Sequence, residues 1–290
     1  MRFVNLLLND VTFVLDESFT SLSQIHDLTI ELHPDQAGSM TEEAKQQKEE
    51  ALEAAKGKAK SYMQLTTESL AMLKLFTDAL ADAFTMPEIV QRLADMLDYN
   101  LDALTGPKAI NLKVENAQLD YKFDPAALLG DIMSVYLNLG AKRAFHQAVA
   151  RDGRSYKPAN FDRTAAIMAR KATKSSEELA RWKRLCDAIA DAKRETEVEE
   201  QDLGDIPDEY LDPILATLMV DPVILPTSKT VIDRATIRQM LLSDPKDPFN
   251  RAPLKIEDVI SNDSLRDEIE AWVAEKKGKK APDTDAMDLS

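Results

Sequence analysis

Proline is spread unevenly along this sequence, and its distribution limits the possible folds more than any other feature. Seven of the 13 prolines lie between residues 207 and 253, whereas residues 1–200 contain five. Proline fixes φ and lacks the N–H that a helix interior or a central strand needs. We therefore expect the segment 207–253 to consist mainly of loops and short elements, with the longest helices before it.

The first 200 residues carry the pattern of an all-α region. Apolar residues recur there at three- and four-residue spacing, and alternating β-branched runs are few. The longest such pattern covers residues 41–83, and its polar first part, to about residue 60, is expected to project into solvent. The predicted fold class is mainly α, with helix pairs stacked as an armadillo-like α-solenoid that keeps only the apolar spacing in common.

Several sequence signals predict where helices begin. Three segments fit the capping box, in which a hydroxyl and a carboxylate satisfy free N–H groups: residues 39–42, 85–88 and 175–178. Pro87 and Pro125 suit the first helical turn, where a missing N–H costs nothing, and the second of them predicts a helix over 125–139. Residues 98–123 lose the apolar periodicity, so we expect a long ordered loop there.

Composition and charge exclude several classes of function. With 36 Lys+Arg against 51 Asp+Glu, the net charge of −15 cannot hold a phosphate backbone, so no nucleic acid partner is expected. The sequence contains no apolar run of about 18 residues, the length that would predict a membrane span. The N-terminus lacks a signal-peptide pattern, and a single cysteine, Cys186, permits no internal disulfide. These features indicate a reducing compartment and no membrane partner.

Metal and cofactor chemistry is not expected either. The three histidines lie far apart, and one cysteine cannot complete a zinc cluster with them: His26, His33 and His146. Only 8 glycines occur, and none belongs to a glycine-rich loop that would hold the phosphates of ATP or a dinucleotide. We therefore predict no metal site and no cofactor.

A second domain is predicted after the acidic run at residues 195–202. We place a helical core at 1–200, a compact α+β domain at 201–277 and a disordered tail at 278–290. Inside the compact domain, Val223-Ile224-Leu225 and Thr230-Val231-Ile232 predict a short hairpin.

Two helices are predicted in the same domain. Asp233 caps a helix that reaches about residue 242. A last helix begins near residue 262, and four apolar residues share one of its faces: Leu265, Ile269, Trp272 and Val273.

Four separated blocks of the proline-rich third form a pattern with a defined order and spacing. They are Ile206-Pro207-Asp208-Glu209-Tyr210-Leu211-Asp212-Pro213-Ile214, Leu218-Met219-Val220-Asp221-Pro222-Val223, Asp233-Arg234 and Asp247-Pro248-Phe249-Asn250-Arg251-Ala252-Pro253-Leu254. This region resembles a U-box, a RING-like module of ubiquitin ligases that lacks zinc. The lack of clustered cysteines and histidines agrees with the resemblance, which implies that packing and polar contacts hold the loops.

Three groups of segments stand out in the first 200 residues. They are Leu6-Leu7-Leu8-Asn9-Asp10 with Leu15-Asp16-Glu17, Tyr99-Asn100-Leu101 with Gly106-Pro107-Lys108, and Val149-Ala150-Arg151-Asp152-Gly153-Arg154-Ser155-Tyr156. These segments resemble the core of the ubiquitin conjugation factor E4 family, whose members are chain-elongating U-box ligases. Members of that family are much longer and end in the U-box, so the chain looks like the C-terminal part of one.

The resemblance implies an activity and a set of partners. It implies a U-box ubiquitin transferase that extends polyubiquitin chains toward proteasomal degradation, in the cytoplasm and nucleus. The implied partners are a ubiquitin-conjugating enzyme, ubiquitin and ubiquitinated substrates, and a Cdc48/p97-type AAA ATPase. In such ligases the chemistry belongs to the thioester of the conjugating enzyme, so no covalent intermediate on this chain is implied.

By the same resemblance, two loops contact the conjugating enzyme. The implied partner-binding residues are Ile214, Leu215, Pro248, Asn250, Arg251 and Pro253. Ile214 would be an apolar anchor, although a residue of this kind can also belong to the core. Arg251 is the predicted catalytic residue, because a planar guanidinium can donate to carbonyls on two partners at once. Its alternative is an internal salt bridge to Asp244 or Asp247.

Other interpretations stay open. The terminal module could only dock partners, as part of a helical adaptor that does not activate transfer. Cys186 could be a nucleophile, but it falls on an apolar helical stripe with Trp182 and Ile189, so we expect a buried structural cysteine. An independent hydrolase has no supporting motif. Three charged residues are predicted to stabilise the zinc-free loops and cap the central helix: Asp221, Asp233 and Arg234.

Overall fold

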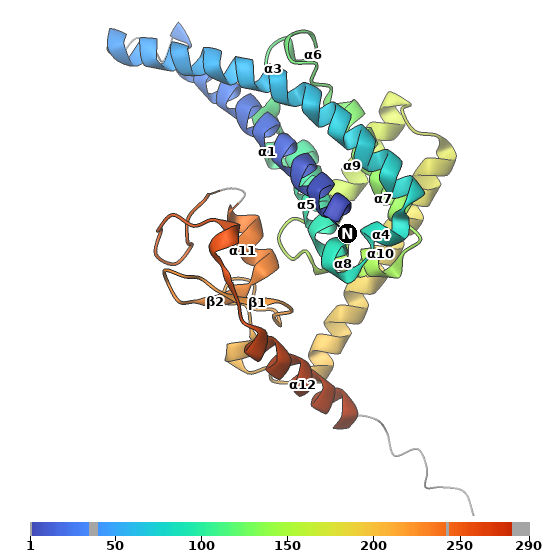
Figure 1. The fold of residues 1–290 in the computed structure, drawn as a ribbon. Coiled ribbons are helices and arrows are strands. Elements are labelled where there is room, and N and C mark those ends of the chain that lie inside the picture. Colours follow the sequence, from blue (N-terminus) through green and yellow to red (C-terminus); the bar gives the residue numbers. More distant parts are fainter. Residues whose placement is uncertain (1, 35–39, 242–243, 280–290) are drawn as a thin grey trace, which may run out of the picture. The chain divides into compact units, whose positions relative to one another are not determined.

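The computed structural model describes residues 2–34, 40–241 and 244–279. The chain divides into two compact units, Met1–Ala192 and Lys193–Ser290 (Figure 1). The predicted domain limits at 200 and 277 remain predictions. Over the described ranges, no helix is both long and apolar enough to cross a membrane.

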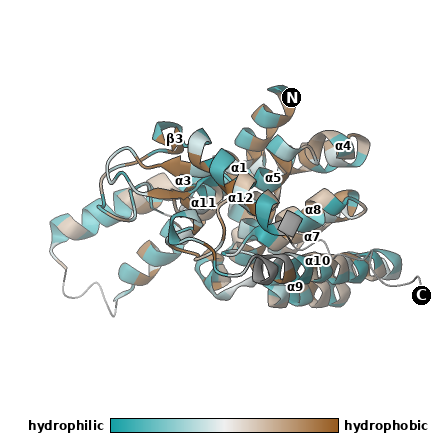
Figure 2. Cartoon of the chain, turned by 90° about the horizontal axis from the view of Figure 1, so that it is seen from below, coloured by the Kyte–Doolittle hydropathy of each residue, from teal (hydrophilic) through white to brown (hydrophobic). Residues whose placement is uncertain are grey.

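In the described part of the first unit, the regular elements are all helices. They are α1 (Arg2–Glu31), α3 (Glu42–Ala79), α4 (Ala81–Phe84), α5 (Pro87–Thr105), the 3-10 helix η1 (Pro107–Leu112), α6 (Ala117–Asp120), α7 (Pro125–Leu139), α8 (Arg143–Arg151), α9 (Pro158–Lys171) and α10, which starts here and covers Ser176–Leu203. Hydrophobic and hydrophilic residues lie side by side along these helices (Figure 2). The predicted helical core is confirmed, and the acidic run at 195–202 is part of α10.

Helices α1 and α3 pack side by side in opposite directions (Figure 1). Rings of Phe3 and Phe76 meet at one end of the pair, with centroids 4.9 Å apart, and the Ser18 and Thr66 hydroxyls are 2.8 Å apart in its interior. The expectation that residues 41–60 project into solvent is wrong for the second half of that segment. Ala55 and Ala59 are buried there, because small side chains let the two backbones approach closely.

The core of this unit is centred on aromatic side chains from α7 to α10. The ring of Tyr136 packs edge-on against Phe161 and Trp182, and the indole N–H of Trp182 donates to the Phe161 carbonyl at 3.1 Å. Cys186 is half-buried beside this core, and burial, with the charges of nearby carboxylates, raises the pKa of its thiol to about 12. A thiol with a raised pKa is a poor nucleophile at neutral pH, in agreement with a structural role.

The helix starts follow the sequence signals in most cases. Ser175 and Glu178 form the reciprocal capping box predicted for α10, and Pro125 lies in the first turn of α7. The prediction of a capping box at residues 85–88 is wrong. The Thr85 hydroxyl does not cap α5, because it donates to the Ala81 carbonyl. Thr41 caps α3, whereas Ser39 of the box predicted at 39–42 lies outside the described residues.

The long loop predicted at 98–123 is wrong over its first part, because α5 continues to Thr105. Its polar residues are buried and bonded within the fold: the amide of Asn100 donates to the Met96 carbonyl at 2.6 Å, and Asp98 accepts from Tyr136 of α7. Polar side chains with interior partners break the apolar periodicity without ending the helix. The remainder contains the short helices η1 and α6.

We expect a measurable pH effect from Asp98, which is buried. Burial raises its pKa well above the usual range, and the charges of Asp152 and Asp95 raise it further, although the hydrogen bond from Tyr136 opposes the change. A carboxyl with a raised folded-state pKa destabilises the fold increasingly as pH rises above its unfolded pKa, near 4. Asp98→Asn should therefore lose less stability than the parent between pH 5 and pH 8, by about 1 kcal/mol or more.

The measurement is urea unfolding at both pH values in a Trp272→Phe background, so that Trp182 reports on this unit alone. Asp27→Asn, at an exposed position of α1, is the matched control. Equal pH dependence in Asp98→Asn and the parent would show that Asp98 does not carry the effect.

The second unit contains a small sheet and two main helices. Its elements are the 3-10 helix η2 (Asp208–Tyr210), β1 (Pro222–Ile224), β2 (Val231–Asp233), α11 (Arg234–Leu241), the 3-10 helix η3 (Ile256–Asp258), β3 (Ile260–Ser261) and α12 (Asp263–Lys279). The strand order is β2-β1-β3, all antiparallel, and Val223 pairs with Ile232. The predicted hairpin and both helices are confirmed, whereas β3 was not anticipated.

A compact apolar cluster holds this sheet to α11. Its buried members are Val223, Leu225, Ile232, Ile237 and Leu254. On α12, Ile269 of the predicted apolar face is buried, and the Trp272 ring meets Tyr210 with centroids 5.7 Å apart. The helix α12 continues to Lys279, and residues 280–290, which make up most of the predicted tail, lie outside the described part.

Candidate functional site: two hydrogen-bonded loops

The first loop is organised by the buried carboxylate of Asp212. One oxygen of this carboxylate accepts the backbone N–H groups of Ile214 and Leu215, at 2.8 and 3.0 Å. The Asp212 N–H donates to the Thr217 carbonyl, and the Ala216 N–H donates to the Asp212 carbonyl, both at 2.8 Å. Together these bonds close a tight loop and hold its tip.

The second loop repeats this frame around Asp247, which is fully buried. Its carboxylate accepts the N–H of Phe249 at 2.9 Å, its own N–H donates to the Ala252 carbonyl at 2.8 Å, and the Arg251 N–H donates to its carbonyl at 2.8 Å. In each loop the fifth residue of the frame has a left-handed backbone, Ala216 with φ 54° and Arg251 with φ 64°. Residues 212–216 of the first loop therefore correspond one to one to residues 247–251 of the second.

This equivalence identifies a residue that the sequence analysis missed. Ile214 and Phe249 both lie two residues after the aspartate of their loop, and their exposed fractions are 41% and 42%. Large apolar side chains that stay exposed on rigid loops are typical of binding anchors. The repeated Asp-Pro pair, Asp212-Pro213 and Asp247-Pro248, was the signal that could have paired the two positions.

A network of charged side chains supports the first loop. The second oxygen of Asp212 accepts the N–H of Asp233 at 2.9 Å, and Asp233 in turn accepts the N–H groups of Val220 and Asp221 at 2.7 and 3.0 Å. Asp233 also accepts the N–H of Ala235 in the first turn of α11, so its predicted role as a helix cap is confirmed.

Arg234 ties this network to the sheet. Its Nε lies 2.6 Å from Asp221, and its Nη2 donates to the Ser261 hydroxyl of β3 at 2.6 Å. The predicted structural role of Asp221 and Arg234 is confirmed by these contacts.

Asp247 joins the second loop to the turn between β1 and β2. Its carboxylate accepts the Thr227 hydroxyl at 2.7 Å and the Ser228 N–H at 3.2 Å. Burial raises the pKa of this carboxyl, but the hydrogen bonds from Ser228, Phe249 and Thr227 outweigh burial and bring the pKa below its usual value. Asp247 is thus held in its charged form. Its oxygens accept hydrogen bonds from the second loop and from the turn between β1 and β2.

The structure divides the predicted contact residues between the two loops. Ile214, with its half-buried neighbour Leu215, lies on the first loop. The second loop carries half-buried Pro248 and three exposed residues: Asn250, Arg251 and Pro253. Asn250 uses its amide oxygen to accept the Ala252 N–H at 3.0 Å, which rigidifies the tip. Ile214 is thus exposed, and the alternative of core packing is wrong.

Arg251 projects from this frame with a side chain that is 71% exposed. Its Nη2 lies 3.3 Å from Asp244, so one of the two internal ion pairs considered from the sequence does form. The other, with Asp247, does not, because that carboxylate is occupied by other donors. An exposed pair of this kind is weak and leaves a guanidinium edge available to partners.

No cluster of three or more His, Cys, Asp or Glu side chains that could hold a metal ion is found among residues 2–34, 40–241 and 244–279. Two histidines contact the backbone: Nδ1 of His26 lies 2.8 Å from the Lys113 carbonyl oxygen, and Nε2 of His146 lies 2.9 Å from that of Gly140. These contacts agree with a structural role for both rings.

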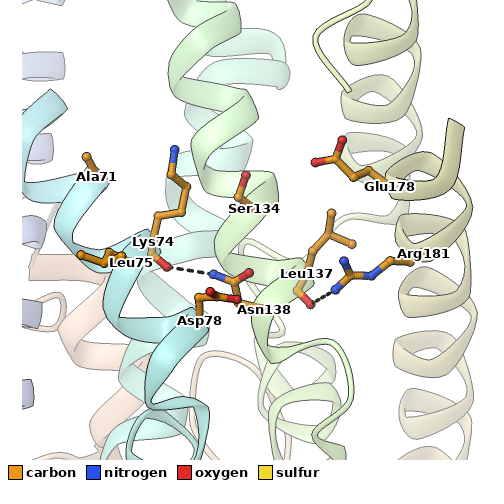
Figure 3. A pocket seen from close by; sticks show the side chains of 9 residues that line it. All are labelled: Ala71, Lys74, Leu75, Asp78, Ser134, Leu137, Asn138, Glu178 and Arg181. Carbon is orange, nitrogen blue, oxygen red and sulfur yellow. Dashed lines mark hydrogen bonds between the residues drawn. The ribbon is translucent and has the colours of Figure 1, made fainter. Parts of the chain in front are cut away.

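A hollow of about 450 Å³ lies elsewhere, between α3, α7 and α10 (Figure 3). Asn138 on its wall donates to the Lys74 carbonyl at 2.9 Å, and Arg181 donates to the Leu137 carbonyl at 3.0 Å. The ammonium of Lys74 is paired with Asp131. The hollow contains none of the predicted site residues, and its Lys74, Asn138 and Arg181 side chains bond to the fold itself.

Comparison with known proteins assigns the two units. The family described as "U-box domain" matches residues 206–278, which include both loops, and the family described as "Ubiquitin elongating factor core" matches residues 1–190. A helical core followed by a zinc-free, RING-like module is thus the class that the fold and the two loops define. The chain belongs to the ubiquitin elongating factor core family and carries a U-box.

Three relatives illustrate the match. The chain is 46% identical over 279 residues to "Ubiquitin conjugation factor E4" of Schizosaccharomyces pombe, covering 96% of the chain and 28% of that relative. It is 41% identical over 280 residues to "E4 ubiquitin-protein ligase UFD2" of Saccharomyces cerevisiae (96% and 29%) and 38% identical over 280 residues to "Ubiquitin conjugation factor E4 A" of Pongo abelii (97% and 26%). The chain thus spans less than a third of the length of these relatives.

Proposed function

We propose that this chain is a U-box ubiquitin-protein ligase that extends ubiquitin chains. The observation that carries the proposal is the pair of equivalent loops, which present exposed Ile214, Phe249 and Arg251 on frames fixed by buried aspartates. Preorganised loops lose little entropy when a partner binds. The names of the relatives, which include "E4 ubiquitin-protein ligase UFD2", support the same function.

The reaction needs no nucleophile from this chain. The amine of a substrate or ubiquitin lysine attacks the thioester carbonyl on the conjugating enzyme, an isopeptide bond forms, and the C–S bond breaks. The proton lost by the nitrogen balances the thiolate, which leaves as the thiol of the conjugating enzyme. The loops would contribute by binding that enzyme and ordering the thioester in a reactive geometry, which is a positional form of catalysis.

The direct test is single-turnover discharge of ubiquitin from a loaded conjugating enzyme onto free lysine. The parent chain should accelerate discharge with at least one of a panel of conjugating enzymes. Binding to these enzymes without acceleration would instead support the alternative, a helical adaptor whose U-box only docks partners.

Ile214→Ala should weaken binding of the conjugating enzyme by more than about 1 kcal/mol, because truncation of an exposed apolar anchor removes contact area at the centre of an interface. Phe249→Ala at the equivalent position is expected to act in the same direction. Isothermal titration calorimetry measures both, with Ile260→Ala as the control for loss of an exposed apolar side chain outside the loops. An unchanged isotherm for Ile214→Ala would remove this residue from the interface.

The remaining features are part of the same proposal. The partners would be a ubiquitin-conjugating enzyme, ubiquitin, ubiquitinated substrates and a Cdc48/p97-type AAA ATPase, with the products directed to proteasomal degradation. The location would be the cytoplasm and nucleus. An armadillo-like stacking of the helical core is proposed from its packed helix pairs, such as α1 with α3 and α5 with α8.

A further inference from the structure

Asp244 lies between two cations of the second loop region. Its Oδ2 is 3.3 Å from Nη2 of Arg251, and its Oδ1 is 3.5 Å from Nζ of Lys246. Among the residues that the structure describes, Asp244 is the ion-pair partner found for Arg251. The carboxylate thus engages a single edge of the guanidinium.

Both ends of this ion pair are anchored through their backbones. The Asp244 N–H donates to the Met240 carbonyl of α11 at 3.0 Å, and the Asp244 carbonyl accepts the Lys246 N–H at 2.7 Å. The Arg251 N–H is held by Asp247 within the loop frame. With both backbones fixed, the conformation of the Arg251 side chain is what can vary, and the ion pair with Asp244 restricts it.

An exposed arginine has many rotamers, and ordering them on binding costs entropy. A carboxylate that holds one edge removes part of this cost in advance. The guanidinium keeps N–H donors on its other edge, which can donate to neutral carbonyl groups while the pair persists. The geometry therefore indicates that Asp244 orients the Arg251 guanidinium and does not keep it from binding a partner.

We propose that Asp244 is a positioning residue that orients Arg251 toward the carbonyl groups of the ubiquitin-loaded conjugating enzyme. This inference rests on the proposed function and extends it, since it assigns a role to a residue that makes no predicted contact with the partner. Its effect should appear in the rate of transfer and not in docking.

The test measures discharge at saturating conjugating enzyme with the full 290-residue chain. Asp244→Asn should lower the maximal rate about three- to fivefold, the size of effect that an exposed ion pair can supply, with an unchanged Kd. Asp244→Glu should recover at least half of the loss. In an Arg251→Ala background, Asp244→Asn should have no further effect, because the group that it orients is gone.

Glu270→Gln on α12 is the matched control, because it removes one exposed negative charge from the same unit. The inference is overturned if Asp244→Asn behaves as this control does, if it accelerates discharge, or if its effect persists without Arg251. A parent chain that accelerates no discharge would instead overturn the proposed function, and this inference with it.

A second readout detects the positioning without any partner. The Nε–Hε resonance of Arg251, observed by NMR in the free protein, should shift in Asp244→Asn and stay unchanged in Glu270→Gln. An unchanged resonance in Asp244→Asn would overturn the inference even if the discharge rate fell.

Discussion

Arg251→Ala is expected to remove most of the acceleration of thioester discharge while docking of the conjugating enzyme stays nearly intact. We expect the rate at saturation to fall about 10- to 100-fold, because the donor that orients the two partners for reaction is lost. The Kd should change by less than about threefold, because the side chain is exposed and an exposed charge contributes little affinity.

The Arg251→Ala substitution should leave the backbone of the loop unchanged. Arg251 has a left-handed φ of 64°, and alanine carries the same Cβ, so the strain at this position is unchanged. Arg251→Lys keeps the charge but loses the planar donor fork, and it should therefore behave much more like Arg251→Ala than like the parent. Equal losses in rate and in affinity would make Arg251 a binding residue only.

Asp247→Asn should have the largest effect on stability in the second unit. The fully buried carboxylate accepts from Phe249, Thr227 and Ser228, and the amide replaces one acceptor by a donor that faces other donors. Unsatisfied buried groups of this kind cost about 2 to 4 kcal/mol in total. The loop and the turn between β1 and β2 should open together, and discharge activity should be lost as a consequence.

Hydrogen exchange measured by mass spectrometry tests this directly. Protection should fall in peptides that cover residues 226–230 and 246–254, with Asp267→Asn, exposed on α12, as the matched control. The pKa of Asp247 is lowered in the fold, so its stabilisation is present above pH 4 and lost as pH falls; the difference between variant and parent should shrink toward pH 3. Unchanged protection at pH 7 would show that the frame does not depend on the carboxylate.

Local chemistry made much of the fold predictable. The reciprocal bonds of Ser175 and Glu178, the first-turn Pro125 and the capping Asp233 involve residues within a few positions of one another, so their geometry is set by the chain itself. The hairpin is local for the same reason. These elements formed where the pattern predicted them, with ends shifted by a residue.

Contacts between distant segments explain the errors. The helix α5 continues through Asp98 because Tyr136, 38 positions later, donates to that carboxylate, and the pattern of apolar residues carries no trace of such a partner. The strand β3 has only two residues, too short for an alternating pattern, and exists because it pairs with β1. Phe249 was missed although the repeated Asp-Pro pair hinted at it, because the hydrogen-bond frame that makes it equivalent to Ile214 forms only in the folded chain.

The sequence alone determined the division into a helical part and a proline-rich, zinc-free module, because helix periodicity and proline geometry act within a few residues. It also indicated the family, through blocks whose order and spacing match, and pointed to Ile214 and Arg251. Only the tertiary structure decided that both loops share one frame, that Asp247 bonds across to Thr227, and that Asp244 and not Asp247 meets Arg251. These are contacts between segments, and the folded chain alone brings their partners within hydrogen-bond distance.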